Sequence, residues 1–195
     1  MQIITLSPTL LDDACTKLSD KAQKALEHIP DAIIGIRSGG APIAESIAEH
    51  IGVKNVAYAD ASRPGSRIRA LLAPLLKAIP RFVTDRLRTV ESRILHHNSH
   101  GNRGGRRNIA FSISGEITMH IAATTMPLLL VVDDAVDSGA TLRGVVTGLA
   151  NMFPHARIVT ASITVTTPDP VIMPDICLYR DTLVRFPWSA DYRDT

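Results

Sequence analysis

Apolar and polar positions follow two different periods along the chain, and the pattern predicts an α/β fold. Short, nearly continuous apolar runs are typical of buried strands, whereas apolar positions three and four apart are typical of helices. The pattern predicts helices over about 10–29, 41–51 and 141–152, and strands over 31–36, 53–59, 108–113, 127–132, 156–165 and 175–179. Because strands and helices alternate, we expect a mostly parallel sheet flanked by helices, in one domain of 195 residues.

The segment 128–142, LLLVVDDAVDSGATL, combines a strand, two acids and a turn of small residues. The apolar run 128–132 suits a strand covered on both faces. Asp133 and Asp134 follow at its carboxyl end, where ligands bind in open α/β sheets. The turn 137–141 has little side-chain bulk, so its N–H groups can surround an anion at the start of the next helix. The segment therefore predicts a site for a phosphate and neighbouring hydroxyls.

A second strand is followed by a glycine-rich turn, Arg37, Ser38, Gly39 and Gly40. The glycines permit close backbone approach, and Arg37 supplies a positive charge for an anion. Gly pairs after strands often mark only a turn. The motif is therefore a weaker signal than the segment 128–142.

The nine residues 133–141, DDAVDSGAT, resemble the phosphoribosyl pyrophosphate (PRPP) signature of the type I phosphoribosyltransferases. The resemblance implies that two acids hold the ribose hydroxyls and the turn holds the 5-phosphate. It also implies that Asp137 accepts a proton near N7 of a purine, and that the turn 37–40 is the pyrophosphate loop. The whole PRPP-binding set is Asp133, Asp134, Ala135, Val136, Asp137, Ser138, Gly139, Ala140 and Thr141. The alternative is a Rossmann-like turn whose acids only cap a helix.

The formal net charge of +2 conceals a basic insertion at 61–108, which holds eleven of the 21 Lys and Arg residues and two of the 19 acids. Helical spacing is followed there by the loop NSHGNRGGRRN, 98–108. The resemblance implies a mobile loop that closes over the reaction, with Arg103, Arg106 and Arg107 as candidates. A solvated basic face and a nucleic-acid surface stay open, although the scarcity of aromatic residues weakens base stacking. His96, His97 and His100 leave a metal site as a further alternative.

The C-terminal segment 181–189, DTLVRFPWS, resembles the hood of guanine, xanthine and hypoxanthine phosphoribosyltransferases, and we expect a small hood over 166–195. Leu183 stands where many of those enzymes carry an aromatic ring, and Thr166-Thr167-Pro168 stands where they carry a lysine. We therefore take Leu183, Phe186 and Trp188 as candidate base-binding residues. The alternative for Trp188 is a purely structural role, in which its ring anchors the packing of the C-terminal segment. The acceptor is a purine-like base, another nitrogenous ring or a pyrimidine.

The resemblance implies a Mg²⁺-dependent phosphoribosyltransferase that releases pyrophosphate from PRPP. Asp137, Asp133 and Asp134 are the candidate catalytic residues, and Asp133 and Asp134 the candidate metal ligands. One alternative is a PRPP- or nucleotide-sensing regulator that binds RNA or DNA through the basic insertion. A sugar-phosphate-binding protein without turnover is another.

Neither a membrane-length apolar run nor a secretion signal is evident in the sequence, and both cysteines, Cys15 and Cys177, lie in apolar patterns. We expect buried thiols and a cytoplasmic homodimer without membrane association.

Overall fold

A computed structural model describes residues 2–61 and 109–193. The predicted basic insertion, with Arg103, Arg106 and Arg107, therefore lies outside the described residues except at its edge. The described helices include none that is long and apolar enough to cross a membrane.

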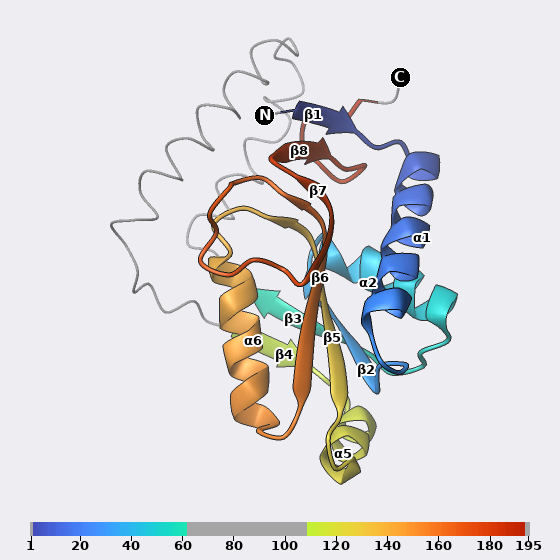
Figure 1. The fold of residues 1–195 in the computed structure, drawn as a ribbon, viewed down its shortest axis with the longest axis vertical. Coiled ribbons are helices and arrows are strands. Elements are labelled where there is room, and N and C mark those ends of the chain that lie inside the picture. Colours follow the sequence, from blue (N-terminus) through green and yellow to red (C-terminus); the bar gives the residue numbers. More distant parts are fainter. Residues whose placement is uncertain (1, 62–108, 194–195) are drawn as a thin grey trace.

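A six-stranded sheet in the order β4-β3-β2-β5-β6-β7 forms the centre of the molecule (Figure 1). Every neighbouring pair is parallel except β3 with β4, which is antiparallel. The predicted α/β fold with a mostly parallel sheet is thus confirmed. The strands are β2 (Ala32–Arg37), β3 (Val56–Ala61), β4 (Ile109–Ser112), β5 (Leu128–Val136), β6 (Arg157–Val165) and β7 (Ile176–Arg180).

Helices cover both faces of this sheet. Helices α1 (Pro8–Ala25) and α2 (Gly40–Ile51) lie on one face, and α6 (Ala140–Met152) lies on the other (Figure 1). Alternate residues of the central strands supply the two cores: Leu130 of β5 packs with the α1 and α2 face, and Val131 packs with the α6 face. The prediction that 128–132 is covered on both faces is therefore confirmed.

Several predicted boundaries shift for local reasons. Helix α1 begins at Pro8 because Ser7 caps it, with the Ser7 Oγ accepting from Leu10 N at 3.3 Å. It ends at Ala25, before the predicted residue 29. Strand β3 starts at Val56, not at 53, because Gly52 closes α2 at a φ of 78° and the chain must first turn.

Strand β5 continues four residues beyond the predicted end at 132. Its backbone keeps pairing with β6 as far as Val136, which lies opposite Val165. Asp133 and Asp134 therefore belong to the last part of the strand and do not follow it. The polar side chains of Asp133 and Asp134 do not end the strand, since the backbone hydrogen bonds with β6 continue past them.

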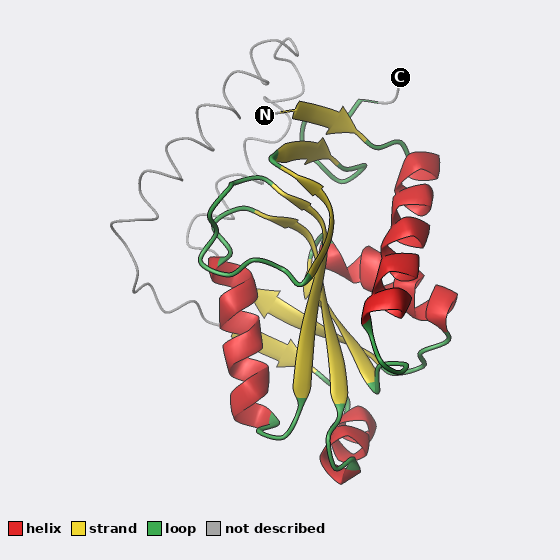
Figure 2. Cartoon of the chain, in the orientation of Figure 1, coloured by secondary structure: helices red, strands yellow, loops and turns green. Residues whose placement is uncertain are grey.

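The sequence pattern does not predict three of the observed elements: α5 (Gly115–Ala123), β1 (Gln2–Thr5) and β8 (Thr182–Arg185). Strands β1 and β8 pair in parallel as a separate two-stranded sheet beyond the main one (Figure 2). The N-terminal strand thus pairs with the C-terminal segment 166–195, which the sequence predicts as a hood, and we keep the name hood for that segment together with β1. Within it, Arg185 Nε lies 2.9 Å from Asp191 Oδ2 in a buried ion pair.

Candidate functional site

Three segments far apart in the sequence meet at the Asp134 carboxylate. Its Oδ1 accepts from Ala135 N at 2.9 Å, and its Oδ2 accepts from Trp188 Nε1 at 2.9 Å. A Cβ added to Gly39 would lie only 1.8 Å from Oδ2, so the Gly39 backbone lies directly against this carboxylate. The structure therefore brings together the predicted PRPP motif, the predicted pyrophosphate loop and the hood.

The surroundings of the two acids differ. Burial raises the pKa of the Asp134 carboxyl, and the hydrogen bond from Trp188 opposes that rise in pKa. Asp133 is 8% exposed, and its Oδ1 accepts from Asp134 N at 3.0 Å. Both carboxylates are thus held in fixed positions at the end of β5.

The glycines of the turn 37–40 are required by close packing. A Cβ on Gly40 would lie 2.4 Å from the Val132 carbonyl oxygen, so only glycine lets α2 start this close to β5. The peptide bond between Arg37 and Ser38 is cis. This packing brings the backbone of the turn beside the acids of β5.

The Arg37 side chain extends along the neighbouring strand β3. Its guanidinium carbon lies 4.7 Å from the centre of the Tyr58 ring, and NH1 lies 3.6 Å from Asp60 Oδ2. The Tyr58 hydroxyl donates to Glu45, and this hydrogen bond raises the Tyr58 pKa. The predicted positive charge at the turn is therefore engaged with Asp60 and Tyr58 in this structure.

Asp137 is held by two threonines, Thr166 and Thr167. In the sequence these residues stand out only because the resembled enzymes carry a lysine in this region. Thr166 Oγ1 donates to Asp137 Oδ1 at 2.7 Å, and Thr167 Oγ1 donates to the Asp137 carbonyl at 2.8 Å. Hydroxyl donors next to an acid are common, so no local signal identified this contact. The bonds fix Asp137 relative to the loop that follows β6.

The turn 138–141 leads into α6 through Gly139, which has a φ of 72°. Ser138 Oγ accepts from Ala140 N at 3.4 Å, and the Ser138 carbonyl accepts from Val171 N at 3.0 Å. Thr141 begins the buried face of α6. The predicted turn of small residues therefore leads into a helix N-terminus, and the loop 166–172 packs against it. Phosphate binding by this turn stays a prediction.

Replacing Gly139 by Ala should destabilise the fold by about 1–3 kcal/mol, because a side chain there needs a positive φ. Its Cβ would also lie 2.8 Å from the Ile172 carbonyl oxygen. Urea denaturation measures the change. The matched control is Gly115→Ala, where no atom lies within 4 Å of the new Cβ, and its stability should stay within about 0.5 kcal/mol of wild type. Equal stability of the two variants would contradict the packing described for Gly139.

The three candidate base-binding residues differ in exposure. Leu183 is 7% exposed and pairs with Ile3 of β1, while Phe186 is 2% exposed and belongs to the core beneath the hood. Trp188 is 39% exposed and stacks on Phe186, with ring centres 5.1 Å apart and planes inclined by 3°. Of these three residues, Trp188 alone offers an exposed ring surface. Its hydrogen bond and stack also make it the packing anchor considered above.

The described residues contain no group of three or more His, Cys, Asp or Glu side chains arranged to hold a metal ion. Asp133 and Asp134 nevertheless provide carboxylate oxygens beside the predicted pyrophosphate loop. Mg²⁺ is commonly bound through one or two carboxylates together with substrate phosphates. The donors present therefore fit a Mg²⁺ ion shared with a phosphate ligand.

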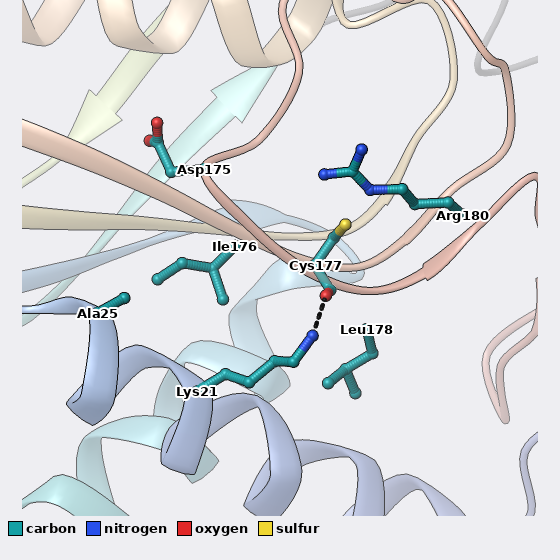
Figure 3. A pocket seen from close by; sticks show the side chains of 7 residues that line it. All are labelled: Lys21, Ala25, Asp175, Ile176, Cys177, Leu178 and Arg180. Atoms are coloured by element: carbon teal, nitrogen blue, oxygen red, sulfur yellow. Dashed lines mark hydrogen bonds between the residues drawn. The ribbon is translucent and has the colours of Figure 1, made fainter.

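A hollow of about 480 Å³ lies apart from these residues, between α1 and the edge strand β7 (Figure 3). Lys21 Nζ donates across it to the Cys177 carbonyl at 3.0 Å, which blocks pairing of a further strand at that position of the sheet edge. Both cysteines are buried, as predicted. The hollow is lined by Lys21, Ala25, Asp175, Ile176, Cys177, Leu178 and Arg180, none of which belongs to the predicted site.

The sequence matches no protein-family model and no curated protein. Among solved structures, a purine phosphoribosyltransferase from Pyrococcus horikoshii aligns with a TM-score of 0.63 and 19% identity, covering 100% of this chain and 98% of that one. The xanthine-guanine-hypoxanthine phosphoribosyltransferase of Helicobacter pylori aligns with a TM-score of 0.62 and 15% identity, over 96% and 93%. A Neisseria gonorrhoeae protein with bound ppGpp aligns with a TM-score of 0.55 and 13% identity, over 96% and 89%. The chain therefore shares the fold of these proteins.

Proposed function

We propose that this protein is a phosphoribosyltransferase that transfers the 5-phosphoribosyl group of PRPP to a nitrogenous base, purine-like in shape, with release of pyrophosphate. The observation that carries the proposal is the meeting of the Gly39 backbone, the acids of β5 and the hood around the DDAVDSGAT motif. The shared fold with two purine phosphoribosyltransferases supports it.

The proposed substrate lies across the end of β5, with its 5-phosphate on the N–H groups of 138–141. The N-terminus of α6 favours an anion there because the aligned peptide dipoles of the helix place partial positive charge at that end. Asp133 and Asp134 accept hydrogen bonds from the ribose hydroxyls. The backbone of Ser38, Gly39 and Gly40 faces the pyrophosphate end, and these fixed donors hold the sugar as positive charge develops at its anomeric carbon.

The acceptor lies between the hood and Asp137 in this proposal. The Asp137 carboxylate accepts the proton that the ring nitrogen loses as it bonds to the anomeric carbon, and Thr166 holds that carboxylate in place. Mg²⁺, when bound by Asp133 or Asp134 together with the pyrophosphate, supplies positive charge that offsets the charge of the leaving group.

The proposed reaction is tested by pyrophosphate release from PRPP and Mg²⁺ with a panel of purine, pyrimidine and other nitrogenous bases. At least one purine-like base should give turnover, and chelation of the divalent cation should abolish it. PRPP binding measured in parallel by calorimetry separates the two steps. Tight PRPP binding without release on any base of the panel would contradict the transferase assignment.

A nucleotide-sensing regulator is the second candidate, because one protein of the same fold holds bound ppGpp. Such a regulator would bind RNA or DNA through the basic insertion at 61–108. Filter binding at low and high salt tests this function, since phosphate contacts weaken steeply with salt. Salt-sensitive nucleic-acid binding without pyrophosphate release would favour the regulator over the enzyme.

A further inference from the structure

Trp188 is the sole tryptophan of the chain, and it connects the hood with the acids of β5. Its ring stacks on Phe186, which is buried in the core. The stack fixes the plane of the indole, and the hydrogen bond to Asp134 fixes the position of its N–H edge. Both contacts restrain the same ring.

The turn that carries Trp188 is itself held firmly. Ser189 N donates to the Phe186 carbonyl at 2.8 Å, and Ser189 Oγ accepts from Phe186 N at 3.0 Å. On either side of this turn, Arg185 and Asp191 form the buried ion pair described above. The indole N–H is therefore presented to Asp134 from a preorganised turn, so little entropy is lost when the hydrogen bond forms.

Asp134 Oδ2 lies between the indole N–H and the Gly39 backbone. The other oxygen, Oδ1, accepts from the neighbouring Ala135 N. The Asp133 side chain also hydrogen-bonds the Asp134 carboxyl, and Oδ2 is the oxygen that accepts from the indole. Loss of the indole N–H would free Oδ2 to turn away from the pyrophosphate loop. The orientation of this carboxylate thus depends on a residue 54 positions away in the hood.

We propose that Trp188 is a positioning residue for PRPP: its indole N–H holds the Asp134 carboxylate against the pyrophosphate loop and so couples the hood to the PRPP site. The inference rests on the proposed function and names how the hood acts on the PRPP side of that site. A positioning role for PRPP requires that loss of the indole N–H weakens PRPP binding even when no base is present. Stacking of Trp188 on the acceptor base would not produce that effect.

Two variants separate the hydrogen bond from the ring stack. Trp188→Phe keeps an aromatic ring over Phe186 and loses the N–H, whereas Trp188→Leu loses both. Calorimetry with Mg²⁺ and PRPP, without a base, should show about tenfold weaker binding for Trp188→Phe, since hydrogen bonds to charged groups are the strong ones. At saturating PRPP its kcat should fall less than the KM for PRPP rises, and its melting temperature should stay near that of wild type.

Unchanged PRPP affinity in Trp188→Phe, with a loss in Trp188→Leu alone, would overturn the positioning role and leave Trp188 as a cover for Phe186. A wild-type protein that binds no PRPP would instead refute the proposed function, and the inference with it. These two failures are distinguished by the wild-type titration.

The fluorescence of the single tryptophan tests the contact without PRPP. Trp188 emission should differ between wild type and Asp134→Asn in the free proteins, because a charged neighbour of the indole is replaced by a neutral amide. The control is Asp175→Asn. This acid directly precedes β7 and hydrogen-bonds to Thr160 of β6, so its replacement should leave the emission unchanged. Identical emission of wild type and Asp134→Asn would overturn the contact on which the proposal depends.

Discussion

Replacing Asp137 by Asn should lower kcat by about a hundredfold or more while the protein stays folded. A positioned general base contributes roughly 10²–10⁴ to a rate, and an amide cannot accept the proton of the acceptor. The amide oxygen can still accept from Thr166 Oγ1, so the 2.7 Å contact that ties the turn to the loop after β6 is retained. Steady-state kinetics with the base selected by the pyrophosphate assay measures the loss.

The matched variant is Thr166→Val, which keeps the carboxylate and removes its hydroxyl donor. We expect a smaller loss, about tenfold in kcat, because the base is present but less well oriented. Equal losses in the two variants would show that position matters more than proton transfer. Full activity of Asp137→Asn would make Asp137 a structural bridge to Thr166 and Thr167 and would remove it from the chemistry.

Replacing Asp133 and Asp134 together by Asn should cut turnover by well over tenfold and raise the KM for PRPP. Two amides still accept hydrogen bonds, but they lack the negative charge that strengthens bonds to the ribose hydroxyls and holds Mg²⁺. Burial raises the pKa of the Asp134 carboxyl, so its ionised form costs stability in the fold at neutral pH. The neutral amide at this position should therefore not lower stability, and kinetics together with thermal denaturation measures both effects.

Asp175→Asn is the control for that double variant, because this acid lies just before β7 and bonds to Thr160 of the neighbouring strand β6. Asp175 Oδ2 accepts from Thr160 N at 2.8 Å and from Thr160 Oγ1 at 2.7 Å. The control should lose stability and keep its KM for PRPP. A double variant with the wild-type rate would leave Asp133 and Asp134 as structural residues only, and the ribose assignment would be wrong.

Local patterns in the sequence were enough for the main strands and helices. The apolar run 128–132, the spacing of Leu142, Val145 and Leu149, and the glycines after β2 each depend on backbone geometry within a few residues. Such patterns also placed the turn 137–141 at the N-terminus of a helix. They did not reveal β1 and β8, because four-residue strands carry little periodic signal and their pairing joins residues at opposite ends of the chain.

The partners of the site residues were decided by tertiary structure. The sequence by itself determined that two acids follow the apolar run 128–132 and that a small-residue turn and a helix come next, since residues adjacent in the chain need no distant contact to be adjacent. Which groups face those acids depends on strand order and on the course of the hood, and these bring Trp188 to Asp134 and Thr166 to Asp137. A side chain can hydrogen-bond only to groups that lie within a few ångströms of it in the folded protein. Those groups can come from distant parts of the sequence, so a local sequence pattern does not identify them.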